Sequence, residues 1–105
     1  MKVYKVRITD KALSDMEEIY LYIAEKLLVL ELAMRQYNRI ADTIETLAIF
    51  PERIKLMESE QLRSLGLRQI SVDNYSVFFH IRDENVIVTN VLYSASDINN
   101  RLRDF

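Results

Sequence analysis

A chain of 105 residues can bury one hydrophobic core but not two, so residues 1–105 are expected to form a single domain. The absence of cysteine excludes disulfide bridges and thiolate chemistry, and the formal charge of −2 lacks the basic excess of proteins that grip nucleic-acid phosphates. No apolar run reaches membrane-spanning length and the charged N-terminus is unlike a secretory signal, so we expect a cytoplasmic protein without membrane contact.

The N-terminal half predicts one strand and two helices. Val3 to Ile8 mixes apolar with basic residues, which is typical of a strand. Thr9 is a candidate N-cap for the first helix, because its hydroxyl can accept a hydrogen bond from an amide of the first turn. The second helix follows a break near Leu28 and stops before Pro51, whose ring disfavours helical backbone at Phe50. The apolar positions at helical spacing are Leu13, Met16, Ile19, Tyr20, Ile23 and Leu27, then Leu30, Ala33, Tyr37, Ile40, Ala41, Ile44 and Leu47.

The C-terminal half predicts three short strands joined by tight turns. The strands are Leu67 to Val72, Tyr75 to Arg82 and Val86 to Val91, with turn residues between them. Alternation places Tyr75, Val77, Phe79 and Ile81 on one face of the sheet. The polar segment Glu52 to Gly66 is either a loop or a short extra helix, and Ser96 to Leu102 could form a last helical turn.

The resulting order, β-α-α-β-β-β, predicts an α+β fold in which a helical hairpin covers one face of a four-stranded, mainly antiparallel sheet. Such an arrangement buries both amphipathic helices and the Tyr75 row together. It leaves Phe78, Val88 and Leu92 in need of cover on the opposite face, which a partner's helix or added strand could supply.

The candidate chemistry is sparse and each residue has an ordinary structural interpretation as well. Arg68 and Arg82 could jointly bind a phosphate or carboxylate, or be two solvated sheet arginines. His80 could act as a general base or simply cover apolar neighbours on its strand. Tyr93 could donate a proton or stack on a base, or belong to the rim of the core. With one histidine and no cysteine, we expect no metal site and no cofactor.

The charge is unevenly distributed along the chain. Residues 10–50 hold eight acidic and four basic side chains, a balance of −4, whereas residues 61–105 hold five of each. Any anion-binding surface is therefore expected on the sheet or the C-terminal segment.

Several segments in order resemble the RelE/ParE superfamily of bacterial toxins. They are VRITDKALSDMEEIYLYIA from Val6, the Phe50–Pro51 pair, LRQISVDNYSVFFHI from Leu67 and VLYSASDI from Val91. The resemblance covers nearly the whole chain and includes the order of elements. It implies the toxin of a type II toxin-antitoxin module, a plasmid-stabilising or growth-slowing system in which a cognate antitoxin silences the toxin.

The resemblance implies two possible activities. ParE-like members trap DNA gyrase by binding it, and their final strand commonly ends in a motif that Val91 to Ala95 and Asp97 match, with Ser96 in place of the usual arginine. RelE-like members cleave mRNA on the ribosome without a metal, for which Arg68, Arg82 and Tyr93 are the catalytic candidates. We expect the ParE-like activity, with ribosomal endoribonuclease as the alternative and an inactive antitoxin-binding or dimerising module as a third.

For the binding activity, the effector surface is expected on the mixed sheet face and the segment Tyr93 to Arg103. The residues expected to bind target or antitoxin are Phe78, His80, Val88, Leu92, Tyr93, Asp97 and Arg101. A homodimer and a heterotetramer with the antitoxin are both possible assemblies.

Overall fold

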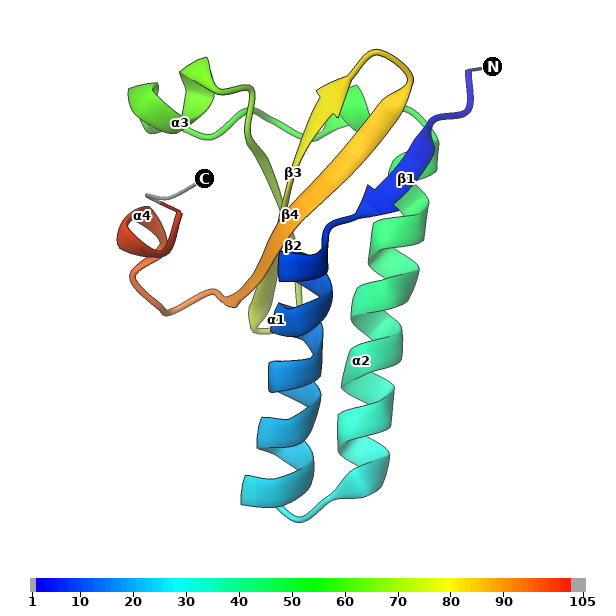
Figure 1. The fold of residues 1–105 in the computed structure, drawn as a ribbon, viewed down its shortest axis with the longest axis vertical. Helices are drawn as coiled ribbons and strands as arrows, with labels where there is room; N and C mark the ends of the chain where they lie inside the picture. Colours follow the sequence, from blue (N-terminus) through cyan, green and yellow to red (C-terminus); the bar gives the residue numbers. More distant parts are fainter. Residues whose placement is uncertain (1, 103–105) are drawn as a thin grey trace.

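Two long helices lie across one face of a four-stranded mixed sheet in the computed structural model, which describes residues 2–102 (Figure 1). The strand order is β1-β4-β3-β2, with β1 parallel to β4 and the other two pairs antiparallel. In chain order the elements are β1 (Lys5–Ile8), α1 (Asp10–Leu21), a π-helical turn (Tyr22–Lys26), α2 (Leu30–Glu45), 3₁₀ turns at Thr46–Ala48 and Pro51–Arg53, α3 (Glu60–Ser64), β2 (Arg68–Val72), β3 (Tyr75–Arg82), β4 (Asn85–Tyr93) and α4 (Ile98–Arg101). The predicted fold class and element order are confirmed, and the linker contains a short helix, α3.

Local sequence signals set the ends of the helical hairpin formed by α1 and α2. The Thr9 hydroxyl accepts a hydrogen bond from the Ala12 amide at 3.1 Å, which confirms the predicted N-cap. Leu28, in the left-handed region with φ 55°, separates the two helices, and Phe50 adopts φ 47° directly before Pro51. No helix within residues 2–102 has the length and apolar composition that crossing a bilayer requires.

The main core lies between this hairpin and the sheet. Val77 and Phe79 face the helices, and Tyr75 and Ile81 pack at the edge of the same cluster, as the alternation predicted. Fully burying each such large apolar side chain contributes about 1.5–3 kcal/mol. The buried members are Tyr4, Ala12, Met16, Ile40, Ile44, Leu47, Val72, Val77, Phe79, Val86, Val88 and Val91.

A bulge in β4 changes which side chains face the helices. Phe78 pairs with Asn90 and Phe79 pairs with Val88, so Thr89 is an extra residue in β4. The extra residue shifts the alternation by one: Val88 faces the helices before the bulge, and Val91 faces them after it. Sequence alternation alone therefore assigns the wrong face to half of β4.

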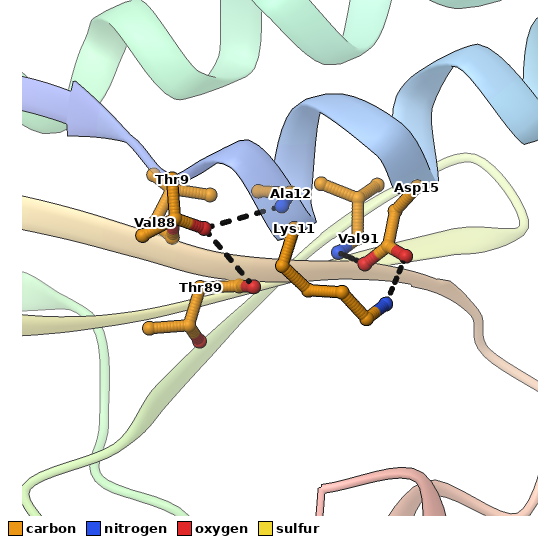
Figure 2. Close-up of polar contacts among 7 residues, drawn as sticks. All are labelled: Thr9, Lys11, Ala12, Asp15, Val88, Thr89 and Val91. Carbon is orange, nitrogen blue, oxygen red and sulfur yellow. Dashed lines mark hydrogen bonds and ion pairs between the residues drawn. The ribbon is translucent and has the colours of Figure 1, made fainter.

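The first turns of α1 satisfy the backbone groups that the bulge exposes (Figure 2). The pairing of β1 with β4 ends at Ile8 and Val88, and the chain then turns into α1 beside the bulge. The Thr9 hydroxyl donates to the Val88 carbonyl at 3.0 Å, and the Asp15 carboxylate accepts the Val91 amide at 2.9 Å. Two helix side chains thus replace the hydrogen bonds that a longer first strand would make.

The expectation that Phe78, Val88 and Leu92 share an open face of the sheet is wrong. Val88 is fully buried on the helix side because the bulge lies after it rather than before it. Phe78 and Leu92 do lie on the opposite face, but they are 0% and 2% exposed. A second cluster covers them with Leu62 of α3, Leu67 and Leu102, and both α3 and α4 lie on that side of the sheet (Figure 1). The chain itself supplies the cover expected from a partner.

The β2–β3 turn is fastened to α2 by a charged contact. Asp73, with φ 55°, accepts hydrogen bonds from Arg39 Nε at 2.7 Å and Nη2 at 3.0 Å, and from Gln36 Nε2 at 3.0 Å. The hydrogen bonds from Arg39, and then those from Gln36, lower the pKa of the Asp73 carboxyl. This contact holds the turn against the helical layer.

Candidate functional site

A groove of about 600 Å³ lies between α1 and the end of β4. We call it the tyrosine groove, because the rings of Tyr22, Tyr75 and Tyr93 line it together with the charged side chains of Glu18 and Arg101. Asp15, Ile19, Val91 and Leu92 complete its walls. The predicted residues Leu92, Tyr93 and Arg101 thus meet at one place.

Three separate segments bring the groove's aromatic rings together. Tyr93 ends β4 directly opposite Tyr75, which begins β3, and the two rings meet edge-on with centroids 5.9 Å apart and planes at 67°. Tyr22 follows α1 at the start of the π-helical turn. The buried hydrogen bond between Asp15 and the Val91 amide fixes α1 against this end of β4. The groove is therefore built on rigid elements.

The C-terminal segment brings one cation to the groove. Asp97 caps α4 by accepting hydrogen bonds from the amide of Asn100 at 3.4 Å and from its side chain at 2.6 Å. Arg101, at the end of this helix, reaches the groove. The observed contacts of Asp97 thus cap α4. Arg103, the last residue of the predicted surface, lies outside the described residues.

The groove presents aromatic rings edged by charged side chains. Burial raises the pKa of the Tyr75 hydroxyl, and its neighbours Tyr93 and Tyr22 raise it further, so this phenol stays protonated near neutral pH. Tyr22 and Tyr93 are 58% and 52% exposed and offer flat apolar faces with polar tips to a ligand. Glu18 and Arg101 add one charge of each sign. Such a surface can bind a stacked ring, a guanidinium group or an amphipathic segment.

The three catalytic candidates do not come together. Arg68 lies opposite Phe79 and so shares the helix-facing side of the sheet, whereas Arg82 alternates to the other side. Arg82 pairs with Asn85, and Tyr93 pairs with Tyr75 seven residues away along β3. At roughly 3.3 Å per residue, about 23 Å separates Arg82 from Tyr93. Arg68 and Arg82 lie on adjacent strands but on opposite faces of the sheet, an arrangement that disfavours joint binding of one anion.

Arg68 instead braces the loop before β2. Its Nη1 donates to the carbonyls of Ile54 at 2.5 Å and Glu52 at 3.5 Å. Glu52 in turn accepts a short hydrogen bond from the Tyr4 hydroxyl, which lowers the pKa of the carboxyl and raises that of the phenol. This set of contacts ties the start of the chain to the loop that follows Pro51.

His80 lies away from the groove. It is opposite Ile87, towards the Arg82 end of β3. Burial, and then the nearby Arg82 charge, lower the pKa of its imidazole, so the ring is neutral near pH 7. Within the described residues, no three histidine, aspartate or glutamate side chains are grouped so that they could hold a metal ion.

Sequence reasoning missed Glu18, Tyr22 and Tyr75 as groove residues. Tyr75 fits the apolar row of β3, and Glu18 fits the solvated face of an amphipathic helix, so neither pattern signals a site. The one available signal is the number of tyrosines, six in 105 residues, of which three gather here.

Comparison with known proteins identifies related sequences and folds. The sequence matches the model of the ParE toxin of the type II toxin-antitoxin system parDE over residues 6–98. A search of curated protein sequences finds no significant match. A chain of the chromosomal ParDE toxin-antitoxin system from P. aeruginosa has a similar fold, with a TM-score of 0.75 and 16% identity over 89% of this chain and 98% of that chain. A chain of the RelBE2 toxin-antitoxin complex from Mycobacterium tuberculosis also has a similar fold, with a TM-score of 0.60 and 18% identity over 87% of this chain and 98% of that chain.

Proposed function

The chain belongs to the ParE toxin family of type II toxin-antitoxin systems, and from that premise we propose that it inhibits growth by binding an essential target such as DNA gyrase. We further propose that a cognate antitoxin neutralises it by covering the tyrosine groove. The observation that carries the proposal is the groove itself, in which half-exposed tyrosines stand on a rigid frame. Aromatic anchors of this kind dominate the energy of protein interfaces.

Arg101 supports the binding role in a specific way. Family members commonly carry an arginine where this chain has Ser96, and the Ser96 hydroxyl donates instead to the Tyr93 carbonyl at 2.6 Å. Arg101 brings a guanidinium group to the same end of β4 from α4. We propose that Arg101 provides the positive charge that the motif otherwise places at Ser96.

The burial of the second sheet face also guides the proposal. Phe78 and Leu92 have almost no exposed surface there, and Val88 is buried on the helix side, so an antitoxin gains little by covering the middle of the sheet. The groove between α1 and β4 offers exposed aromatic surface instead. His80 and Asp97, the remaining predicted binding residues, are placed at the far end of β3 and at the cap of α4.

The endoribonuclease alternative receives less support from the geometry. Metal-independent cleavage needs an acid, a base and a cation within reach of one phosphate. Arg82 and Tyr93 lie at opposite ends of the β3–β4 pair, about 23 Å apart. Arg68 donates its hydrogen bonds to the carbonyls of the loop before β2. A dispersed set of this kind favours a contact function.

The discriminating experiment compares two substitutions of one residue. Induced expression of the chain should arrest growth and give gyrase-dependent DNA cleavage, and co-expression of a cognate antitoxin should relieve both. Tyr93→Ala should weaken gyrase binding by about 30-fold, as expected for a central aromatic anchor, whereas Tyr93→Phe should keep most of it because the ring remains. Arg82→Ala, at the distant end of the sheet, is the matched control and should behave as wild type.

Opposite results would contradict the proposal. New mRNA ends in translated messages with gyrase unaffected, together with at least about a tenfold loss in Tyr93→Phe, would identify a ribonuclease that uses the hydroxyl. Absence of growth arrest on expression would instead identify an inactive binding module. Thermal unfolding of each variant confirms that a loss of activity is not a loss of folded protein.

A further inference from the structure

Three basic side chains share the sheet face opposite the two long helices, and we call them the basic patch: Lys5, Arg7 and Arg82. Lys5 pairs with Asn85 of β4, which pairs in turn with Arg82 of β3, and directly paired residues share a face. Arg7 lies two residues beyond Lys5 on β1, so it shares that face too. Val6, between them, packs in the main core, which places the patch on the side away from the helices.

The register of the strands sets the size of the patch. Lys5 and Arg82 are separated by β4, so at about 4.8 Å per strand their Cα atoms lie about 10 Å apart. Arg7 lies about 7 Å from Lys5, at about 3.3 Å per residue along β1. All three side chains are exposed. The patch therefore presents three cations within about 12 Å of one another.

No carboxylate among the described residues pairs with these cations. The two ion pairs found within residues 2–102 each involve a side chain of α1 or α2 and no member of the patch. Arg7 is oriented by a neutral partner instead, since its Nε donates to the Asn85 Oδ1 at 3.0 Å. That bond leaves the two terminal nitrogens of the guanidinium group available to an anion.

The acidic residues nearest in sequence are Asp83 and Glu84, in the β3–β4 turn. The pKa of the Tyr4 phenol is raised first by its hydrogen bond to Glu52, and the charge of Glu84 adds to this shift. Tyr4 packs in the main core, so Glu84 acts on the helix side of the sheet. Asp83 remains as the one carboxylate beside Arg82 in sequence, and it provides a test below.

The surroundings of the patch favour a duplex over a single strand. Proteins that bind single-stranded nucleic acid stack its bases on exposed aromatic rings. The exposed aromatic residues within residues 2–102 are Tyr22 and Tyr93, in the tyrosine groove, and Phe50, beside Tyr4. None of them lies at the patch. A duplex needs no such ring, because its bases stay stacked inside and it presents phosphates at about one charge per 1.7 Å of its axis.

We propose that the basic patch binds the phosphates of double-stranded DNA without reading the sequence. The choice of DNA over duplex RNA rests on the proposed function, since gyrase acts on DNA. Three phosphate contacts on a chain of net charge −2 make a weak, salt-dependent association. Its effect is to raise the local concentration of the toxin where its target is bound.

Fluorescence anisotropy of a labelled DNA duplex of about 20 base pairs, titrated with the chain between about 20 and 200 mM salt, tests the proposal. The logarithm of the binding constant should fall with that of the salt concentration with a slope of about −2.7, about 0.9 for each of three phosphates. Arg82→Ala should reduce the slope by about 1 and weaken binding about tenfold at the lowest salt, whereas Arg82→Lys should keep both near wild type. Arg35→Ala, which removes an exposed charge from α2 behind the sheet, is the matched control and should change neither.

Asp83→Asn tests the patch in the opposite direction. Asparagine tolerates the left-handed φ of 55° at this position, so the turn is kept while one negative charge beside Arg82 is removed. DNA binding at low salt should become about twofold tighter. A variant that merely disturbed the fold would bind more weakly, and circular dichroism checks that each variant is folded.

The absence of duplex binding at low salt overturns the proposal, as does a salt slope that Arg82→Ala leaves unchanged. Tighter binding to the separated strands, to duplex RNA of the same sequence or to a polyglutamate peptide also overturns it, and assigns the patch to that partner. Affinity for gyrase in the absence of DNA is a separate measurement. Arg82→Ala should retain it and Tyr93→Ala should lose it, so the failure of either proposal is distinguishable from the failure of the other.

Discussion

Asp15 provides the most direct test of how the helical layer is joined to the sheet. Its side chain, in a residue only 3% exposed, accepts the amide of Val91 just beyond the β4 bulge and pairs with the ammonium group of Lys11 (Figure 2). Replacing Asp15 by alanine removes the acceptor, while Val91 remains 1% exposed. Water can replace the lost partner only by entering from the tyrosine groove, whose walls include both residues.

The cost follows from the environment of each group. A buried amide left without a partner costs about 1–3 kcal/mol. Lys11, whose side chain is 61% exposed, regains water on losing its partner, so the ion pair adds about 0–1 kcal/mol. Asp15→Ala should thus lower the free energy of unfolding by about 1–4 kcal/mol, a large part of the 5–15 kcal/mol expected for a domain of this size. The melting temperature should fall by roughly 4 °C or more.

Urea denaturation of three variants measures the separate contributions. Asp15→Asn keeps an oxygen acceptor for the Val91 amide and should cost about 1 kcal/mol, the difference between a charged and a neutral hydrogen bond. Lys11→Met removes only the exposed partner and should change stability by less than about 1 kcal/mol. If Asp15→Ala unfolds within about 0.5 kcal/mol of the wild type, the reasoning about the bulge is refuted.

Three further predictions concern the second sheet face, the β2–β3 turn and the loop brace. Phe78→Ala should cost about 3–5 kcal/mol in chemical denaturation, and a cost below about 1 kcal/mol would mean that α3 and α4 leave that face open. Asp73→Asn should lose stability near pH 7, and its difference from wild type should vanish in acid. The hydrogen bonds from Arg39 and Gln36 lower the pKa of Asp73 in the folded state below its ordinary value of 3.8. They therefore stabilise the fold at pH values above 3.8, and this stabilisation is lost as the pH falls through the folded-state pKa. A difference that persists at pH 2 would contradict it. Arg68→Ala should reduce stability by about 1–3 kcal/mol while growth inhibition per folded molecule is retained; lost toxicity at unchanged stability would make Arg68 catalytic.

Sequence patterns were sufficient for the elements and their order because their signals are local. The helical spacing, the Thr9 cap, the break at Leu28 and the stop before Pro51 each depend on residues within a turn or two of one another. The turns at Asp73 and Asp83, both with φ 55°, depend on neighbours in the same way. Fold class followed from these elements, since amphipathic helices and a half-apolar sheet have few ways to bury their surfaces.

The sequence by itself determined which residues form strands and helices, and which rows of side chains are apolar. Only the tertiary structure decided which face of β4 each residue occupies, because the bulge at Thr89 is stabilised by Thr9 and Asp15, about 75 to 80 positions away. It also decided that the chain covers its own second face and that Tyr22, Tyr75, Tyr93 and Arg101 converge on one groove. Alternation and helical spacing carry no information about contacts between segments so distant in sequence, and these contacts create the site.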